Sequence, residues 1–426
     1  EIWEHKYRLK EPDGTPRDRT FEETVLRVAR AAAEGERSGK RARERWTSRY
    51  AEAMASFSFL PAGRILAGAG TRRAVTLSNC FVMGPIPDDL GGIFDGVREA
   101  ALTMQAGGGI GHDFSTLRPK GALVRSIGAD ASGPLSFMDV WDAMCRTIMS
   151  AGARRGAMMA TMRCDHPDIE DFIAAKSDPA RLRNFNLSVL VSDAFMTAVA
   201  EDRDWDLHFG GKVYHTLPAR ALWDRLMRAT YDYAEPGVVF IDRVNARNNL
   251  RYCEDIHATN PCGEQPLPPY GACLLGSINL ASLVAAPFTA SAQLDTARLD
   301  ELAGLGVRFL DSVVDVSHYP LEAQRREAKS KRRIGLGVTG LADALVMCGV
   351  RYGSAEAVAL AGDWMRRVQD AAYAASAGLA SEKGAFPLYD RERFAESANV
   401  AALDAEVRAA VHRHGVRNGC LTSIAP

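Results

Sequence analysis

The sequence predicts a large α/β domain preceded by a helical region, and three observations lead to this prediction. The 426-residue chain is 47% hydrophobic and 25% charged, a composition that lets a globular protein bury a sizeable core. Residues from about 20 to 57 carry apolar positions at helical spacing. Beyond them, short apolar stretches alternate with glycine- and proline-containing loops and helical segments. We therefore expect a helical region over 1–60 and one α/β domain over 61–426.

The individual elements follow from periodicity and capping signals. Thr20 can cap the first long helix, and Glu23 three residues later would complete a capping box. Strands are expected at 76–83, 187–191, 238–241, 273–280 and 419–424, and helices at 92–105, 135–149, 219–234, 298–314, 340–347 and 354–382.

Charge, hydropathy and cysteine usage exclude several classes of protein. A formal net charge of -1 gives no electrostatic reason to bind nucleic acid or an anionic membrane. No apolar run reaches the roughly 18–20 residues that span a bilayer. The eight cysteines are scattered without a CxxC pair, so we expect a cytoplasmic protein in which any disulfide is catalytic. Neither end of the sequence reads as a natural terminus, so we expect a piece of a longer protein.

The most informative segment is Asn260-Pro261-Cys262-Gly263-Glu264. Alternate residues of an extended or looped backbone point the same way, so the amide, the thiol and the carboxylate are expected to share one face. Proline restrains this backbone and glycine permits close approach. Such groups can perform nucleophilic or radical chemistry, move a proton and orient a substrate. The alternative is a capped turn without chemistry.

Two further cysteines stand in distinctive contexts, Cys80 within 77–82 and Cys273 within 271–280. Taken singly, each is more simply a buried core thiol. The remaining five cysteines are interpreted as structural. Cys164 and His166 are close in sequence, but no second ligand pair stands at zinc spacing, so no metal site is predicted.

Three glycine-containing segments have open interpretations. The run at 107–111 follows a helical segment, which argues against a Rossmann turn; it is either a helix stop or a place where the backbone approaches a base or sugar. The GxGxxG match at 335–340 follows a basic segment rather than a strand, so we do not expect it to bind a dinucleotide. The basic loop at 152–157 either binds phosphate groups or base edges through its two arginines or is an exposed charged turn.

Together these segments resemble the large catalytic chain of ribonucleotide reductases, most closely the adenosylcobalamin-dependent (class II) type. The Asn-x-Cys-x-Glu pattern, with a second cysteine eleven residues after Cys262, is the most specific part of the resemblance. The resemblance runs through 77–82, 107–119, 131–138, 152–157, 165–172, 260–280 and 333–343.

The resemblance implies a ten-stranded α/β barrel with a loop carrying Cys262 through its centre. It implies that Cys262 becomes a thiyl radical that takes hydrogen from C3′ of the substrate ribose. Glu264 would remove the 3′-hydroxyl proton, and Asn260 would orient the ribose hydroxyls. Cys80 and Cys273 would supply two electrons and finish as a disulfide, which requires about 4.4–6.8 Å between their Cα atoms.

The same matching implies further sites and partners. Adenosylcobalamin would generate the radical, ribonucleoside diphosphates would be the substrate, and a thioredoxin-type protein would be the reductant. The helix with Phe137, Val140 and Trp141 would form part of a homodimer face near a deoxynucleoside triphosphate effector, and the loops 122–132 and 151–161 would link effector to substrate. The implied substrate-binding residues are Ser58, Asn79, Gly108 and Gly109, and the implied effector residues are Asp88, Asp89, Arg125, Arg154 and Arg155. The phosphate-binding loop of the family would follow Pro426.

Three alternatives remain open at the level of sequence. The first is the large chain of a metal-radical (class I) reductase that needs a small partner subunit. The second is an inactive homologue that binds nucleotides as a regulator. The third is a thiol hydrolase in which His257 activates Cys262, although this interpretation leaves Cys80 and Cys273 unexplained.

Overall fold

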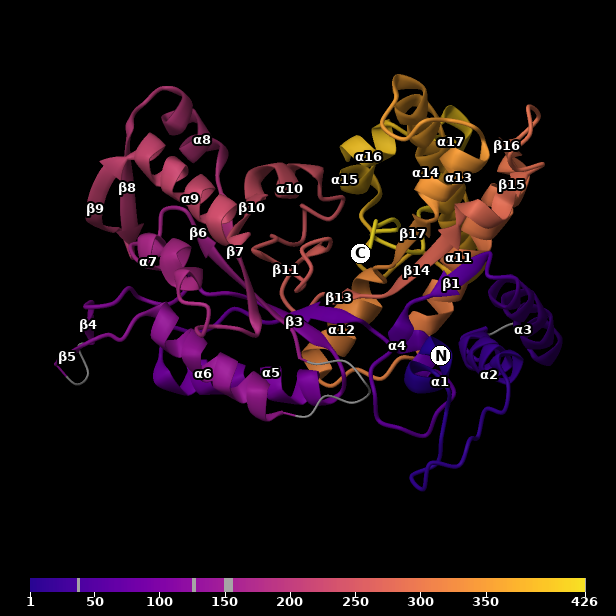
Figure 1. Ribbon diagram of the computed structural model, residues 1–426, viewed down its shortest axis with the longest axis horizontal. Helices are drawn as coiled ribbons and strands as arrows, with labels where there is room; N and C mark the ends of the chain where they lie inside the picture. The colour runs from indigo at the N-terminus through magenta and orange to yellow at the C-terminus, as the bar shows by residue number, and fades with distance from the viewer. Residues whose placement is uncertain (37–38, 125–127, 149–155, 426) are drawn as a thin grey trace. The chain divides into compact units, whose positions relative to one another are not determined.

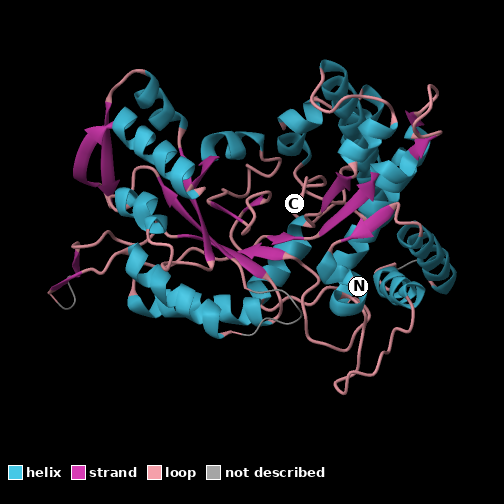
Figure 2. Cartoon of the chain, in the orientation of Figure 1, coloured by secondary structure: helices cyan, strands magenta, loops and turns pink. Residues whose placement is uncertain are grey.

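The computed structural model describes residues 1–36, 39–124, 128–148 and 156–425, and these residues form two compact units. The first unit combines 1–79 with 272–426, and the second unit is the continuous segment 80–271. Helices and strands alternate along much of the chain (Figure 2), as the predicted α/β class requires. The predicted boundary between residues 60 and 61 stays a prediction.

The first unit is built around a long helix, α11 (Thr296–Val316), whose apolar residues are buried. Phe309 of this helix makes edge-to-face contacts with Tyr50 and Phe59, at centroid distances of 5.1 and 5.3 Å. The backbones of Gly35 and Ser312 approach so closely that a Cβ on Gly35 would lie 2.6 Å from the Ser312 carbonyl oxygen. The N-terminal helices therefore share the core of α11.

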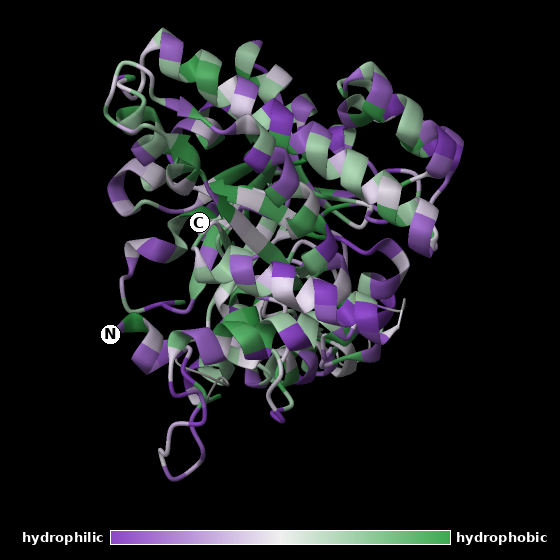
Figure 3. Ribbon diagram, turned by 90° about the vertical axis from the view of Figure 1, so that its right-hand side faces the viewer, coloured by the Kyte–Doolittle hydropathy of each residue, from purple (hydrophilic) through white to green (hydrophobic). Residues whose placement is uncertain are grey.

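A small sheet of order β1-β14-β17 lies in this unit, with β1 antiparallel and β17 parallel to β14. Hydrophobic colour gathers in the interior in Figure 3, whereas the outer helices carry hydrophilic bands. The elements of this unit are α1 (Ile2–Lys6), α2 (Phe21–Ala33), α3 (Lys40–Ala55), β1 (Phe59–Pro61), α4 (Gly63–Gly68), β13 (Ala272–Cys273), β14 (Leu275–Asn279), β15 (Val284–Ala285), β16 (Gln293–Leu294), α11, α12 (Glu322–Lys331), β17 (Gly335–Thr339), α13 (Leu341–Met347), α14 (Ala355–Lys383), α15 (Arg391–Ala395), α16 (Ala398–Ala401) and α17 (Ala405–His414).

A buried ionic network joins three parts of the first unit. The carboxylate of Asp311, which is fully buried, lies 2.8 Å from the Arg332 guanidinium and 3.4 Å from that of Arg417. The side-chain amide of Asn418 donates to the same carboxylate at 3.1 Å. These buried charges compensate one another, and Asp315 adds a second carboxylate 3.0 Å from Arg332, so loss of Asp311 would leave an excess of buried positive charge.

The second unit contains strands in the order β10-β7-β6-β3-β2, all paired in parallel. Parallel pairing requires crossover connections, and helices supply them. Helices α5 and α6 lie side by side along this sheet (Figure 1). The elements are β2 (Cys80–Val82), α5 (Leu90–Gln105), β3 (Gly109–Asp113), β4 (Leu123–Val124), β5 (Ala129–Asp130), α6 (Pro134–Thr147), β6 (Met158–Arg163), α7 (Ile169–Ala174), β7 (Phe185–Val191), α8 (Asp193–Ala200), β8 (Asp204–Phe209), β9 (Lys212–Pro218), α9 (Ala219–Tyr233), β10 (Gly237–Phe240), α10 (Ile241–Arg247), β11 (Ala258–Thr259) and β12 (Pro266–Leu267).

Most expected elements are confirmed, with three differences among the strands. Of the segment 76–83, only Cys80–Val82 forms a strand, β2. The segment 273–280 is divided, because β13 ends at Cys273 and β14 begins at Leu275. The segment 419–424 is wrong as a regular strand: it makes an isolated parallel bridge, Leu336 to Thr422. Thr20 caps α2 by accepting from Glu23 N, as predicted, while the Glu23 carboxylate accepts from Arg19 N. Among the described residues, no helix is both long and apolar enough to cross a membrane.

Candidate active site

The predicted catalytic motif forms a closed loop between two short strands. Strands β11 and β12 pair with Ala258 opposite Leu267 and Thr259 opposite Pro266, and the loop 260–265 connects them. Gln265 N donates to Asn260 Oδ1 at 2.9 Å, and Asn260 N donates to Gln265 O at 3.1 Å. Gly263 turns the chain with φ +82°, a conformation that disfavours any side chain. We call residues 260–265 the cysteine loop.

The three chemical groups of the cysteine loop differ in exposure. Asn260 is fully buried, Glu264 is half-buried and Cys262 is exposed. Asn260 Nδ2 and Glu264 Oε2 are buried atoms that have no hydrogen-bond partner among the described residues. Unsatisfied polar atoms are costly in a folded protein, so a donor and an acceptor left beside an exposed thiol indicate a site for a polar ligand.

The cysteine loop lies directly on strand β3, and glycines allow this approach. A Cβ on Gly109 would lie 3.0 Å from both Cys80 Sγ and Pro261 Cγ. A Cβ on Gly111 would lie only 1.9 Å from Thr259 O. Gly109 and Gly111 therefore serve close backbone packing under the loop, which neither interpretation of the run included, whereas Gly107 follows the end of α5 with φ +99°. Gly108 instead packs against the ring of Phe81.

Neighbouring strands hold the loop through side chains. Asn186 of β7 donates from Nδ2 to Pro261 O at 2.6 Å, and Thr161 of β6 donates to His257 O at 2.9 Å. Neither residue was identified from the sequence, and the contact of Gly111 with Thr259 was not predicted. Gly111 belongs to the predicted glycine run, whereas nothing in the sequence around Asn186 or Thr161 indicates the contact.

The remaining cysteines divide by environment. Cys80 is buried in β2, where it stands opposite Gly109 in the strand register. Cys273 lies in the first unit, where Asn79 N donates to its carbonyl oxygen at 3.0 Å. Because Cys80 and Cys273 belong to different units, their approach to disulfide distance stays a prediction. Burial raises the pKa of the Cys145 and Cys164 thiols to about 11, which keeps them protonated and fits a structural role.

Two of the implied substrate-binding residues lie in the first unit. Ser58 is buried, its hydroxyl accepts from Ser56 Oγ at 3.1 Å, and its carbonyl oxygen accepts from Asn279 N. Asn79 Oδ1 is buried and has no hydrogen-bond partner within the described part of the chain. Gly108 and Gly109 lie in the second unit, beside β2.

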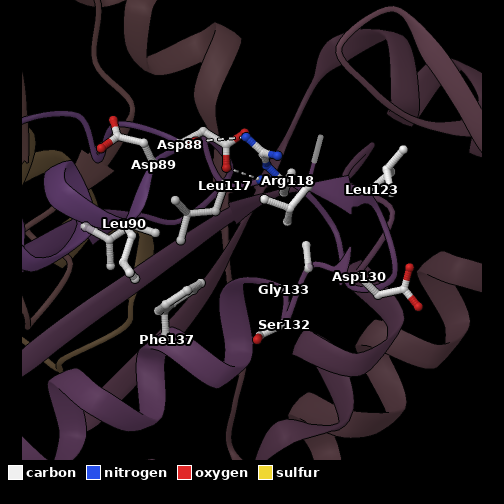
Figure 4. Close-up of a pocket in the computed structure, with 13 residues that line it drawn as sticks. Asp88, Asp89, Leu90, Leu117, Arg118, Leu123, Asp130, Ser132, Gly133 and Phe137 are labelled. Carbon is white, nitrogen blue, oxygen red and sulfur yellow. Dashed lines mark hydrogen bonds and ion pairs between the residues drawn. The ribbon is translucent and has the colours of Figure 1, made fainter. Parts of the chain in front are cut away.

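A second site is a cavity of about 730 Å³ in the second unit, a volume typical of small-molecule pockets. In Figure 4, Asp89 and Asp130 lie on opposite sides of the cavity, and Phe137 of α6 points into it. Arg118 is fixed by Asp88, since Arg118 Nε and N donate to the carboxylate at 2.9 and 3.0 Å. The cavity thus combines an apolar ring, a cation and carboxylates.

Only two of the five implied effector residues lie in the part of the chain that the structure describes. Asp88 and Asp89 line this cavity, although Asp88 binds Arg118 and Asp89 caps α5 by accepting from Gly92 N. Arg125, Arg154 and Arg155 lie outside the described residues.

The expectation that Trp141 contributes to a dimer face is wrong. Trp141 is fully buried, packs edge-to-face on Phe114 at 5.4 Å and donates to His112 Nε2 at 3.1 Å.

Fold and site define a class of protein: an α/β protein in which a cysteine-bearing loop lies across parallel strands. The family description "Ribonucleotide reductase, barrel domain" matches residues 78–426, and "Ribonucleotide reductase, all-alpha domain" matches residues 1–74. The chain belongs to the ribonucleotide reductase large-chain family.

Curated relatives agree with this assignment. The chain is 44% identical over 404 residues to a vitamin B12-dependent ribonucleoside-diphosphate reductase of Mycobacterium tuberculosis, covering 93% of this chain and 57% of the relative. It is 38% identical over 385 residues to a protein of the same name from Thermoplasma acidophilum, covering 89% of this chain and 49% of the relative. A ribonucleoside-diphosphate reductase subunit alpha of Chlamydia muridarum is 25% identical over 440 residues, covering 89% of this chain and 41% of the relative. The chain thus spans about half the length of these relatives.

Proposed function

We propose that this chain is the catalytic part of an adenosylcobalamin-dependent ribonucleotide reductase that converts ribonucleoside diphosphates to 2′-deoxyribonucleoside diphosphates. The observation that carries the proposal is the cysteine loop, in which the exposed Cys262 lies between Asn260 and Glu264. Each of these two neighbours has a buried polar atom without a hydrogen-bond partner among the described residues. The names of the B12-dependent relatives support the choice of substrate and cofactor. The relative named as a subunit alpha is less similar, which disfavours the alternative of a large chain that needs a partner subunit.

Each group of the loop has a role in the proposed reaction. The Cys262 thiyl radical takes a hydrogen atom from C3′ of the ribose and returns one at the end. Glu264 accepts the 3′-hydroxyl proton, which assists departure of the 2′-hydroxyl group as water. Asn260 Nδ2 donates to a ribose hydroxyl, which would satisfy the buried amide.

Cys80 and Cys273 supply the reducing equivalents in this proposal. Two thiols and one ribonucleotide give one disulfide, one deoxyribonucleotide and one water, so two electrons and two protons leave the thiols. Cys80 is buried against Gly109, close to Pro261 of the cysteine loop. A thioredoxin-type protein would then reduce the disulfide for the next turnover.

The cofactor has to reach Cys262, and the exposure of this side chain is compatible with an external radical source. Adenosylcobalamin, when bound, supplies the organic radical that oxidises the thiol. The residues of this chain would then orient the ribose and keep water away from the sulfur. We assign no residue as a ligand of cobalt.

The cavity between α5 and α6 is proposed to bind a deoxynucleoside triphosphate effector. Phe137 offers a face for the base, Arg118 a charge for phosphate, and the Asp89 carboxylate an acceptor for a ribose hydroxyl. Helix α6 begins at Pro134 without a side-chain cap, which leaves amide groups for an anion. We propose that the protein acts as a cytoplasmic homodimer, with Ser58, Asn79, Gly108 and Gly109 near the substrate.

The proposed reaction is tested with the full-length protein by measuring conversion of CDP to dCDP in dithiothreitol, with and without adenosylcobalamin. Cofactor-dependent activity without an added subunit is expected. Cys262→Ser is expected to abolish reduction while leaving CDP binding intact, because an alcohol cannot form the radical reversibly. Cys253→Ser, a change at another exposed cysteine, serves as the matched control. Tight CDP binding without turnover under both conditions would support a partner-dependent reductase or a regulatory homologue instead.

The proposed effector site has a separate test in the preference of the enzyme among CDP, ADP and GDP with dTTP, dGTP or dATP. Phe137→Ala is expected to remove the change in preference, because the base would lose its stacking partner. Phe94→Ala, on the exposed surface of α5 and outside the cavity, is the control. An active wild-type enzyme whose preference ignores all three nucleotides would refute the effector assignment.

A further inference from the structure

The hydrogen bond from Asn186 to the cysteine loop has no role in the scheme above. Asn186 Nδ2 donates to Pro261 O at 2.6 Å, and Pro261 O belongs to the peptide group that joins Pro261 to Cys262. A carbonyl oxygen held at this point fixes the orientation of the peptide plane, and therefore the direction in which the Cys262 side chain leaves the backbone. The bond thus acts on the residue that carries the proposed chemistry.

The strand end that carries Asn186 is itself fixed. Asp142 of α6 is buried, and it accepts from Asn184 N at 2.9 Å and from Asn184 Nδ2 at 3.1 Å. The Asn184 carbonyl oxygen accepts from Met158 N at 3.0 Å. Asn186 then pairs in the parallel ladder opposite Met159 of β6. The amide donor is therefore presented from a rigid strand rather than from a loop.

The pairing of β11 with β12 holds the two ends of the cysteine loop, and the bond from Asn186 adds a directional contact at Pro261 itself. Gly109 and Gly111 give β3 a smooth surface on which Pro261 and Thr259 rest. Contacts with glycines set the distance of the loop from the sheet but give little resistance to sliding or rotation. A directional hydrogen bond from a neighbouring strand supplies that resistance.

Stability alone is a poor explanation for this contact. Asn186 is exposed, whereas Pro261 is buried. A neutral hydrogen bond from an exposed amide contributes little to folding, since water replaces the bond on one side when it breaks. Its geometric effect on Cys262 does not depend on a large energy. A catalytic group that is misplaced by about 1 Å loses about 100-fold in rate.

We propose that Asn186 is a positioning residue for Cys262, holding the Pro261–Cys262 peptide so that the sulfur takes a single position over the substrate ribose. The catalytic part of this inference rests on the proposed reductase function. The structural part, control of the position of the Cys262 thiol, is independent of that function and has its own measurement.

Asn186→Asp is the decisive variant, because it preserves size and replaces the donor by a carboxylate that repels Pro261 O. Asn245→Asp is the matched control. Asn245 Nδ2 also donates to a backbone carbonyl, Ile256 O at 3.0 Å, in the segment that leads to the cysteine loop. Asn186→Gln retains an amide donor and tests for partial rescue.

Two quantities are measured on the full-length protein. The first is kcat and KM for CDP reduction, where Asn186→Asp is expected to lower kcat by about 10- to 100-fold and to change KM by less than about 3-fold. The second is the rate of iodoacetamide alkylation at Cys262 without cofactor, read by peptide mass spectrometry against Cys253. We expect the ratio of the two rates to change by about 3-fold or more in Asn186→Asp and to stay unchanged in Asn245→Asp.

The outcomes distinguish failure of the positioning role of Asn186 from failure of the proposed reductase function. An unchanged alkylation ratio in Asn186→Asp overturns the positioning role, whatever happens to kcat. Equal changes in Asn186→Asp and Asn245→Asp overturn it as well, because they would reflect general loosening of the segment. If the alkylation ratio changes only in Asn186→Asp and the wild-type protein does not reduce CDP, the positioning role is supported and the proposed reductase function is refuted.

Discussion

Gly111 is the position where a single methyl group should do most damage to the cysteine loop. An ideal Cβ at Gly111 lies 1.9 Å from Thr259 O, and real Cβ atoms essentially never approach another heavy atom within 3.0 Å. Gly111→Ala therefore requires the carbonyl and the strand to separate by about 1.1 Å. Both partners are backbone, so rotation of a side chain cannot relieve the overlap.

The magnitude follows from the size of that displacement. Overpacking a close-packed interior costs about 1–3 kcal/mol, so Gly111→Ala should lower the free energy of unfolding by that amount. Thr259 directly precedes Asn260, so the shift passes into the catalytic part of the loop. A displacement of about 1 Å at a reacting group lowers kcat by about 100-fold. Activity should therefore fall far more than the loss of stability explains.

The assay compares CDP reduction with urea unfolding of the same preparations. Gly378→Ala is the control, because Gly378 lies in α14 with no atom within 4 Å of an added Cβ. An alanine in that helix should stabilise the protein by about 0.4–1 kcal/mol without a change in kcat. If Gly111→Ala folds normally and keeps the wild-type kcat, the cysteine loop tolerates a displaced backbone and our reasoning about Gly111 is wrong.

Further predictions concern thiol chemistry, pH and the buried charges. Cys80→Ser and Cys273→Ser should each stop multiple turnover in dithiothreitol, and normal cycling by either variant would contradict the paired-thiol assignment. Burial lowers the pKa of His112 to about 3, so the unfolded chain binds the proton more readily and stability is lost as pH falls below about 6.5. From pH 7.5 to 5.5 this contribution should lower the unfolding free energy by about 1.4 kcal/mol in the wild type and be absent in His112→Gln. If the difference in unfolding free energy between the two proteins is the same at both pH values, the prediction is contradicted. Asp311→Ala should lower the unfolding free energy by about 3–5 kcal/mol in urea, because two buried guanidiniums, Arg332 and Arg417, lose a shared carboxylate and Asp315 compensates only Arg332. A loss below about 1 kcal/mol would show that the network relaxes.

Local signals were sufficient for most elements of the fold. Helix α14 was predicted at 354–382 and extends over Ala355–Lys383, since its Ser354 cap and long run of good helix formers act within the segment. The segment 419–424 reads as a strand from its apolar residues, yet it forms no regular strand, although its backbone makes hydrogen bonds and an isolated bridge to residues 334–336. Strand pairing depends on a distant partner, which a local pattern does not reveal.

The GxGxxG match at 335–340 shows the same distinction. Its first five residues form β17 itself, so Gly335 and Gly337 lie within the strand, and Gly340 follows it as the N-cap of α13. A Cβ on Gly337 would lie 2.2 Å from Ser423 O, which explains the glycine by close packing of the bridge segment. This packing role of Gly337 depends on a contact with residues 423–424, which the local motif does not reveal.

The candidate site divides in a similar way. Asn260, Cys262 and Glu264 were identified because their chemistry and spacing stand together in the sequence. Gly111 and Asn186 act on the same loop from other strands. The absence of a side chain at Gly111 lets the Thr259 carbonyl approach, and the Asn186 amide donates to the Pro261 carbonyl. Neither contact leaves a pattern in a single sequence, because an isolated glycine or asparagine has many other uses.

The discontinuous first unit has a consequence for synthesis on the ribosome. The second unit is a continuous segment whose last residue is Gly271, so all of its strands have been made before α11 emerges. The N-terminal helices cannot complete their packing until α11 has been synthesised, because the carboxylate of Glu36 is buried against the guanidinium of Arg308, 272 residues later in the chain. At about 5–20 residues per second, Glu36 spends tens of seconds without this partner. Chaperones would therefore be expected to engage the nascent chain at its first helices rather than at its central sheet.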